Sequence, residues 1–581
     1  MSPFSFIFPQ FPALIAVAMI PCMALAQTNS SPSPSATPAT NAPAYTEAYI
    51  LTPKPASKPR ITGPKIFGVR PGNPFLFTVT ATGDKPMNFT ADNLPSGLSL
   101  DPKTGMITGT LKEKGTNSVT LHAKNALGEA TRPFRIVCGD TISLTPALGW
   151  NSYNCYGKKV DDAKMRSAVD AIVSTGLIDH GWSYINIDDN WEGTRDTNGM
   201  IQGNENFPDL KALSDYIHSK GLKFGIYSTP GPWTCAGFEG SLNHEDDDAR
   251  QYGNWGVDYV KYDSCTYSPL AGAVNVEQFA QLLPPDDATK LRALAKEKLP
   301  LDLVPAKKRT EEQKATLEDL NKQWDQLVGK LTPEQKGKMV LLMRQIPYAK
   351  FRQSLDKVNR DIVFSYCQYG GAKVWEWGAK LGGNSWRTTV DIIDTWQSMS
   401  GIGFGENGHE KFASPGHWND PDMLIVGKVG WGHPRPSRLT PDEQYTHVSL
   451  WALISSPLLI GCDLSQLDDF TKSLLCNDEV LDVNQDPLGK PAGRISQNGD
   501  AQVWARDLED GSKAAGLFNL GDKPMTVSVT WAELGIKGPQ VVRDLWRQKD
   551  LGTFNDKFEA TVQPHGVVLV KITPLDIKPS K

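Results

Sequence analysis

The segment Tyr259-Val-Lys-Tyr-Asp-Ser-Cys265 decides the fold, because a short apolar run stops there at a carboxylate. Similar runs end in polar residues at Ile185-Asn-Ile-Asp188, Lys223-Phe-Gly-Ile-Tyr227 and Ile362-Val-Phe-Ser365, with helical stretches between them. This alternation predicts a parallel β/α fold. Functional side chains at strand ends are typical of an eight-fold (β/α)8 TIM barrel, whose active site lies at the carboxyl ends of its strands. We therefore predict a catalytic (β/α)8 barrel over residues 140–488.

The sequence around the barrel has other patterns. Residues 267–346 are rich in Lys, Glu, Gln and Leu and predict amphipathic helices inserted on a β/α loop. Short alternating runs between Gly and Pro turns predict an N-terminal antiparallel β-sandwich over residues 61–139 and a C-terminal one over residues 489–575. Within the first, the stretch from Leu94 to Thr110 resembles the immunoglobulin-like (Ig-like) module of exported bacterial enzymes, to which we assign no chemistry.

The amino terminus has the features of an export signal. Residues 1–26 carry almost no charge and end in Ala24-Leu-Ala26, the small-residue pattern that precedes a signal-peptidase cleavage site. We expect an exported protein, periplasmic or extracellular. Residues 27–60, rich in Ser, Pro, Thr and Ala, predict a disordered linker. No later window approaches ~18 uninterrupted apolar residues, so we predict no membrane span.

Composition limits the classes of partner. The 60 basic and 65 acidic side chains give a net charge of −5, which leaves no positive surplus for a nucleic acid. The 16 Trp suit the faces of sugars, although most Trp in any fold pack in the core. None of the 8 Cys stands in a CxxC pair, which argues against zinc ribbons and thioredoxin chemistry.

Two acidic clusters follow predicted strands. Asp188 and Asp189 are adjacent, and two neighbouring carboxylates repel unless cations or hydroxyl donors meet them; the alternative is a helix cap or a solvated turn. Lys261 and Asp263 are two apart on a strand, so both side chains project the same way. The ammonium would then keep the carboxylate ionised by lowering its pKa, as a nucleophile requires. The alternative is a structural ion pair.

A third cluster lies in Trp386-Arg-Thr-Thr-Val-Asp391. Arg387 can reach a substrate hydroxyl or carboxylate, and Asp391 offers a second acid; the alternative is a helical i,i+4 salt bridge. With Asp263, Asp391 supplies the two carboxyls that glycoside hydrolysis uses, one as nucleophile and one to protonate the leaving oxygen.

The clusters, in this order, resemble glycoside hydrolase family 27, the α-galactosidases and α-N-acetylgalactosaminidases. The resemblance extends from Pro146 to Gly489. Its motifs include Pro146-Ala-Leu-Gly-Trp-Asn-Ser-Tyr153, Lys261-Tyr-Asp-Ser-Cys265, Asn384-Ser-Trp-Arg-Thr-Thr-Val-Asp391, His417-Trp-Asn-Asp-Pro-Asp-Met423 and Asn484-Gln-Asp-Pro-Leu-Gly489.

The resemblance implies a role for each site residue. Asp263 would be the nucleophile and Asp391 the acid/base of a retaining double displacement, with carboxyls ~5–5.5 Å apart. Asp188 and Asp189 would hold the 6- and 4-hydroxyls of galactose, and Trp150 would lie against the apolar face of the ring. It also implies that Lys261 and Arg387 donate to hydroxyls, that Asp422 and the Cys367–Tyr369 segment line the pocket, and that Cys235 and Cys265 form a disulfide beside it.

Two departures from the family pattern bear on structure and specificity. Asn190 stands where relatives carry a cysteine, so we expect Cys155 to lack the usual bridge. Cys367-Gln-Tyr369 stands where plant relatives have Cys-Glu-Trp, beside the 2-hydroxyl. Bulk there favours galactose, and α-N-acetylgalactosaminidase or β-L-arabinopyranosidase activity and a non-catalytic glycan-binding protein are the alternatives. This chemistry requires no metal or organic cofactor, and the sequence leaves the oligomeric state open.

Overall fold

The computed structural model describes residues 49–575. The predicted signal peptide, residues 1–26, and most of the predicted linker lie outside the described residues. At the described end of that linker, Ile50 N donates to Tyr445 Oη at 2.6 Å and Thr52 N donates to Ser473 Oγ at 2.9 Å. Among residues 49–575, no helix is both long enough and apolar enough to cross a membrane.

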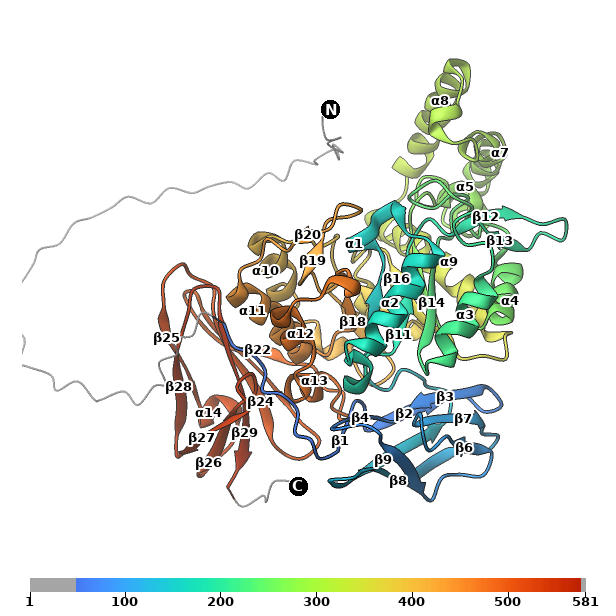
Figure 1. The fold of residues 1–581 in the computed structure, drawn as a ribbon. Helices are drawn as coiled ribbons and strands as arrows, with labels where there is room; N and C mark the ends of the chain where they lie inside the picture. The colour runs from blue at the N-terminus through green and yellow to red at the C-terminus, as the bar shows by residue number, and fades with distance from the viewer. Residues whose placement is uncertain (1–48, 576–581) are drawn as a thin grey trace, which may run out of the picture. The chain divides into compact units, whose positions relative to one another are not determined.

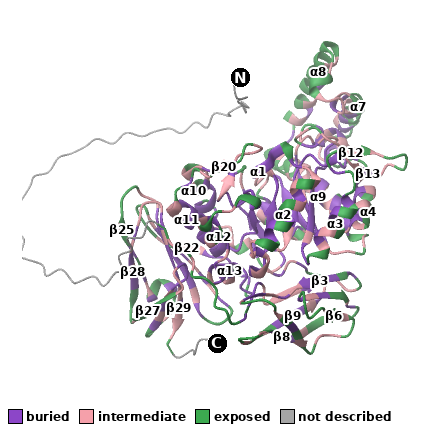
Figure 2. Ribbon diagram, viewed as in Figure 1, coloured by how far each residue is buried: buried purple, intermediate pink, exposed green. Residues whose placement is uncertain are grey.

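The described residues contain a parallel sheet of eight strands (Figure 1). Its members are, in spatial order, β18 (Trp418–Asp420), β17 (Ser385–Arg387), β16 (Val363–Cys367), β15 (Tyr259–Asp263), β14 (Lys223–Ser228), β11 (Tyr184–Asn186), β10 (Leu148–Asn151) and β21 (Leu458–Ile460). A parallel bridge between Leu424 and Ile460 joins the segment after β18 to β21 at the opposite edge. The strands are buried (Figure 2), as in a sheet that is covered by helices. The predicted (β/α)8 architecture is confirmed.

Six of the eight helices around the sheet begin at residues that cap free backbone N–H groups. The Asp161 side chain accepts from Lys164 N at the start of α2, and Thr440 and Glu443 form a capping box at the start of α11. The helices are α1 (Tyr153–Tyr156), α2 (Asp162–Ser174), α3 (Leu210–Ser219), α4 (Glu245–Trp255), α10 (Trp396–Phe404), α11 (Pro441–Leu453), α12 (Asp469–Leu475) and α13 (Asp478–Asn484). Short 3-10 helices lie at Gly157–Lys159, Leu177–His180, Val374–Glu376, Ala379–Leu381, Glu410–Phe412 and Leu464–Gln466. Two β-hairpins also occur: β12 (Glu192–Arg195) pairs with β13 (Ile201–Gly203), and β19 (Lys428–Val429) pairs with β20 (Arg435–Pro436).

The predicted insertion is helical. Thr310 and Thr332 each form a capping box, with Gln313 and Gln335, at the starts of its two longest helices. Its helices are α5 (Ala271–Val274), α6 (Val276–Ala280), α7 (Pro285–Asp302), α8 (Glu311–Gly329) and α9 (Pro333–Asp356), with a 3-10 turn at Ala306–Lys308. Much of α8 is exposed (Figure 2), and α6, α7 and α8 share a small apolar cluster around Phe279, Leu291 and Leu327.

Antiparallel β-structure precedes and follows the barrel. The N-terminal Ig-like part contains β1 (Arg60–Thr62), β2 (Ile66–Val69), β3 (Pro74–Thr78), β4 (Thr80–Thr82), β5 (Asn88–Asp92), β6 (Leu98–Leu100), β7 (Met106–Thr110), β8 (Gly115–Asn125) and β9 (Gly128–Cys138). The C-terminal part contains β22 (Gly493–Asn498), β23 (Ala501–Asp507), β24 (Lys513–Asn519), β25 (Met525–Thr530), α14 (Trp531–Leu534), β26 (Gln540–Asp544), β27 (Lys549–Phe554), β28 (Lys557–Val562) and β29 (Val567–Pro574). Only the pairing of β2 with β9 is parallel in these two parts.

Candidate active site

Neighbouring barrel strands carry polar side chains at their carboxyl ends. In the strand register, Tyr227 on β14 lies beside Lys261 on β15, and Asp263 lies beside Cys367 on β16. Residues paired in neighbouring strands project to the same face, and side chains two apart on one strand do so too. The register therefore brings Tyr227, Lys261, Asp263 and Cys367 to one face at the mouth of the barrel.

Asp263 is held through only one of its carboxylate oxygens. Its Oδ2 accepts hydrogen bonds from the hydroxyls of Tyr227 at 3.2 Å and Tyr369 at 3.0 Å. Its Oδ1 has no hydrogen-bond partner among residues 49–575. Burial raises the pKa of Asp263; Lys261 works against this rise, and the negative charge of Asp391 adds to it. Asp391 is thus close enough to Asp263 for its charge to affect the ionisation of Asp263.

The ammonium of Lys261 has a direct partner other than the one the strand spacing suggests. Its Nζ lies 2.8 Å from Asp188 Oδ2, which also accepts from Asn151 Nδ2 at 2.9 Å. Burial disfavours the charged lysine, but Asp188 and the other acidic groups around it together outweigh burial, and the pKa of Lys261 is raised. Lys261 therefore lowers the pKa of Asp263 through space, without a salt bridge to it.

The adjacent pair Asp188 and Asp189 is not a solvated turn, since each residue is only 2% exposed. Asp188 is neutralised by Lys261. Asp189 Oδ2 accepts from the backbone N–H of Ala236 at 2.7 Å, and its Oδ1 has no partner among the described residues. Burial raises the pKa of Asp189 to about 6, and the charges of Asp188 and Asp263 act in the same direction. The pair thus meets a cation, one of the partners expected from its sequence, and a backbone N–H donor in place of the hydroxyl donors also expected there.

Arg387, at the end of β17, connects Asp391 to Asp422. Its guanidinium lies 3.1 Å from a carboxylate oxygen of each. Arg387 and Asp391 are four apart, but this ion pair lies outside any helix. Asp422 Oδ2 also accepts from Ile392 N at 2.8 Å, so it holds the backbone directly after Asp391. The Asp391 side chain is 69% exposed whereas that of Arg387 is 3% exposed, so a buried cation anchors an accessible acid.

Two further predicted residues are buried close to these groups. The Cys367 thiol lies 3.8 Å from Arg387 Nη1, and burial raises its pKa well above the ordinary value. Trp150 is fully buried, and its indole N–H donates to the Cys462 carbonyl at 2.7 Å. Contact of Trp150 with a sugar ring, which the family resemblance implies, therefore requires movement of the side chains that cover it.

Cys235 and Cys265 form the disulfide that the resemblance implies, and Cys155 is a free, buried thiol. The sulfurs of the disulfide lie near Asp263, in a grouping of the kind that binds metal ions. Metal binding uses the thiolate form of cysteine, and these two sulfurs are bonded to each other. This grouping is therefore unsuited to holding a metal ion.

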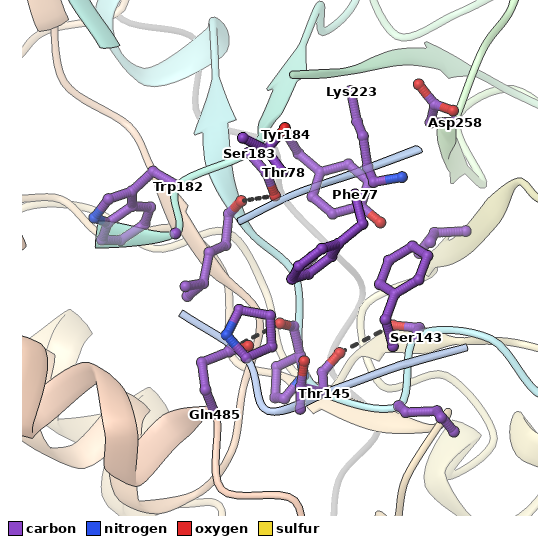
Figure 3. A pocket seen from close by; sticks show the side chains of 18 of the residues that line it. Phe77, Thr78, Ser143, Thr145, Trp182, Ser183, Tyr184, Lys223, Asp258 and Gln485 are labelled. Atoms are coloured by element: carbon purple, nitrogen blue, oxygen red, sulfur yellow. Dashed lines mark hydrogen bonds between the residues drawn. The ribbon is translucent and has the colours of Figure 1, made fainter. Parts of the chain in front are cut away.

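A separate cavity lies at the other end of the barrel strands (Figure 3). Its lining includes Tyr184 and Lys223, which begin β11 and β14, and Asp258, which precedes β15. Phe77 and Thr78 of the Ig-like part also line it. In (β/α)8 enzymes catalysis takes place at the carboxyl ends of the strands, and the amino ends serve stability. We therefore assign this cavity no part in the site.

The structure adds groups that the sequence reasoning missed. The Tyr227 hydroxyl contacts Asp263, and Asn151 contacts Asp188. A signal for Tyr227 existed in the sequence, because it ends a predicted apolar run, and Asn151 stands in one of the motifs that carry the family resemblance. Asp420, whose pKa burial raises to about 6, accepts from Asp422 N at 2.9 Å.

Comparisons with known proteins show the family of the chain. The family profile described as "Alpha galactosidase A" matches residues 145–282 and 336–486 and leaves out the central part of the helical insertion. The profile of the "Alpha galactosidase C-terminal beta sandwich domain" matches residues 498–572, and the Ig-domain profile He_PIG matches residues 58–139. The family matches thus extend over the barrel and both flanking β parts.

Similar proteins come from plants, bacteria and fungi. Alpha-galactosidase 2 of Arabidopsis thaliana is 35% identical over 445 residues, which are 76% of this chain and 92% of that protein. A crystal structure from Bacteroides fragilis, described as a candidate alpha-galactosidase/melibiase, has a TM-score of 0.74 and 32% identity, and the match covers 89% of this chain and 98% of that chain. Alpha-galactosidase I of Mortierella vinacea has a TM-score of 0.57 and 29% identity, over 74% and 97% of the two chains. The chain belongs to glycoside hydrolase family 27, the α-galactosidase family.

Proposed function

We propose that the protein is a retaining exo-α-galactosidase that removes terminal α-linked galactose from oligosaccharides and glycans. The observation that carries the proposal is the state of Asp263, which is buried, is held at Oδ2 and has no hydrogen-bond partner at Oδ1 within the described part of the chain. A carboxylate with one oxygen fixed and one free is oriented for nucleophilic attack. Asp391, accessible and paired with Arg387, is the second carboxyl that the reaction needs.

The reaction has two steps. In the first, an oxygen of Asp263 forms a bond to the anomeric carbon while the glycosidic bond breaks, and the leaving oxygen takes a proton from Asp391. In the second, Asp391 removes a proton from water, whose oxygen attacks the anomeric carbon and releases Asp263 as a carboxylate. Two inversions at one carbon retain the α configuration. These steps balance without a cofactor.

We infer the sugar from the acidic pair. Asp188 and Asp189 would accept hydrogen bonds from the 6- and 4-hydroxyls, and Oδ1 of Asp189, which has no partner among residues 49–575, supports this role. A pentose such as β-L-arabinopyranose lacks the group at carbon 6 and would leave one of these acceptors unpaired, which is costly when it is buried. The bulk of the side chains at Cys367 and Tyr369 would disfavour a 2-acetamido group, which favours galactose over N-acetylgalactosamine.

Aryl glycosides test this proposal. We expect the wild type to hydrolyse p-nitrophenyl α-galactoside in preference to the α-N-acetylgalactosaminide and the β-L-arabinopyranoside. Asp263→Ala should lower kcat by about a thousandfold or more, since removal of a nucleophile leaves only the remaining binding interactions. Full residual activity of this variant would refute the nucleophile assignment.

Azide separates the two carboxyl roles. With Asp263→Gly, azide should take the place of the missing nucleophile and give a β-galactosyl azide after one inversion. With Asp391→Gly, azide should attack the galactosyl enzyme and give the α-galactosyl azide. The same anomer from both variants, read by proton NMR, would contradict the two assignments.

The proposal includes export and the division of labour along the chain. The signal-like residues 1–26 and the Cys235–Cys265 disulfide support an oxidising compartment, periplasmic or extracellular. Catalysis belongs to the barrel, residues 140–488, with residues 61–139 and 489–575 as accessory β modules. Mass spectrometry of the protein purified from its native host tests export: a mature chain that begins at Gln27 is expected.

A further inference from the structure

Tyr369 lies between the two carboxyls of the site. Its hydroxyl donates to Asp263 Oδ2 at 3.0 Å, and the guanidinium carbon of Arg387 lies 5.5 Å from the centre of its ring. Arg387 in turn pairs with Asp391. A single side chain therefore contacts the nucleophile through its polar end and the partner of the acid/base through its ring face.

The backbone is strained to hold Tyr369 there. Tyr369 has a φ of +59°, and Ala372 and Lys373 of the same turn also have positive φ, which residues with a Cβ adopt at a cost of roughly 1–2 kcal/mol each. Gly370 N donates to the Arg387 carbonyl at 3.0 Å, which attaches the turn to the end of β17. A Cβ on Gly370 would lie 2.2 Å from the Thr388 carbonyl oxygen, so this close attachment requires glycine. Strain of this kind persists at functional sites, where surrounding structure maintains it.

We propose that Tyr369 is a positioning residue for the nucleophile: its hydroxyl, together with that of Tyr227, holds Asp263 Oδ2 so that Oδ1 attacks the anomeric carbon. This inference rests on the proposed function and deepens it. The sequence suggests only that Tyr369 fills space beside the 2-hydroxyl. The structure shows that the Tyr369 hydroxyl donates to the Asp263 carboxylate. The tryptophan of the plant pattern has no hydroxyl that could make this hydrogen bond.

The hydrogen bonds that the two tyrosine hydroxyls donate to Asp263 change in strength between the two chemical steps. A hydrogen bond to the charged carboxylate is stronger than one to the ester carbonyl that forms from Oδ2 in the galactosyl enzyme. Tyr369 therefore stabilises free Asp263 more than the intermediate. In the first step this interaction weakens as the ester forms. In the second step it strengthens as the carboxylate leaves, so Tyr369 favours breakdown of the intermediate.

Tyr369→Phe tests the proposal, since it removes the hydroxyl and keeps the ring against Arg387. A donor to the ionised form lowers the pKa of Asp263, so its loss raises that pKa, and the acidic limb of kcat/KM should move to higher pH by about one unit. Breakdown of the intermediate should slow about tenfold, which lowers kcat and KM together. Because the intermediate then accumulates, we expect a burst of p-nitrophenol, measured by absorbance. We also expect a galactosyl adduct in acid-quenched protein, measured by mass spectrometry.

A matched control and a second variant make the test specific. Tyr366→Phe removes a neighbouring buried hydroxyl that donates to the Leu381 carbonyl at 2.8 Å, and it should change neither the acidic limb nor the burst. Tyr227→Phe removes the other donor and should shift the limb in the same direction as Tyr369→Phe.

Three results would overturn the proposal: an acidic limb that stays in place in Tyr369→Phe, the absence of an adduct, or equal effects in Tyr366→Phe. Failure of the proposed function is distinguishable from all three, because the wild type itself would then release no galactose.

Discussion

The charge of Lys261 acts on two carboxylates by two routes. Its salt bridge is to Asp188, with Nζ and Oδ2 2.8 Å apart, while Asp263 is affected through space. Both charges of the bridge are almost completely buried, with side-chain exposures of 14% and 3%. Removing one partner of a buried pair leaves an unpaired charge, which costs more than the pair contributes. One substitution at Lys261 should therefore affect stability, sugar binding and the nucleophile together.

We predict that Lys261→Met lowers stability by about 3–5 kcal/mol and lowers kcat/KM on the aryl α-galactoside. Its acidic limb should also shift to higher pH, because the cation that lowers the pKa of Asp263 is gone. Thermal unfolding and a pH series of kcat/KM measure the two effects. Lys114→Met is the matched control, since the Lys114–Asp140 pair is exposed and such pairs contribute about 0–1 kcal/mol.

The double variant Lys261→Met with Asp188→Asn separates the two effects. It removes both buried charges, so stability should recover in part while activity stays low. A double variant no more stable than Lys261→Met alone would contradict a buried-charge penalty.

The strands that carry the site residues approach one another closely at Gly225. Gly225 on β14 pairs with Asn186 on β11, two residues before Asp188. A Cβ at Gly225 would lie 1.8 Å from Asn186 Oδ1 and 3.0 Å from Tyr259 Cβ, both in neighbouring strands. The inside of the barrel therefore has no room for a methyl group at this level, directly below the acidic pair.

Gly225→Ala should lower the thermal midpoint, with a cost of about 1–3 kcal/mol from overpacking, and raise KM by displacing Asp188. Gly337→Ala, on an exposed turn of α9 with no atom within 4 Å of the added Cβ, should instead stabilise its helix by about 0.5–1 kcal/mol. Calorimetry measures the change in stability of each variant, and kinetics on the aryl galactoside measure the change in KM. A neutral Gly225→Ala would mean that β11 and β14 can separate without consequence.

Hydrophobic periodicity and the polar ends of apolar runs predicted the barrel and the end of it that carries the site. The sequence could not predict which side chains pair with one another. Apolar runs that stop at Asp188, Tyr227 and Lys261–Asp263 were sufficient for the barrel and for the level of the site. The choice of Asp188 over Asp263 as partner of Lys261 depends on how neighbouring strands are staggered, which one strand's sequence does not contain. The Tyr369 hydroxyl reaches Asp263 because of a left-handed turn, a backbone state that Tyr seldom adopts.

At the scale of the whole molecule, the two flanking β parts differ in how they relate to the barrel core. The apolar cluster of the Ig-like part contains only residues between Ile61 and Cys138. The barrel cluster, in contrast, includes Trp504, Phe518 and Trp546 from the C-terminal part. Trp546 Nε1 donates to Ser449 Oγ on α11 at 2.8 Å, and Arg506, 3% exposed, donates to the Val483 carbonyl on α13 at 2.8 Å. One face of the C-terminal sheet is thus part of the catalytic core.

This difference predicts opposite outcomes for two truncations. A chain that begins at residue 140 keeps the whole barrel cluster, so its kcat/KM on the aryl galactoside should stay within about threefold of the full chain, since separate cores fold separately. A chain that ends at residue 489 exposes large apolar side chains worth about 1.5–3 kcal/mol each and should aggregate or lose its cooperative thermal transition. Size-exclusion chromatography, calorimetry and the aryl-galactoside assay distinguish the two. A stable, active chain without residues 490–581 would contradict the shared core, and an inactive chain without residues 1–139 would mean that the Ig-like part supports the active site itself.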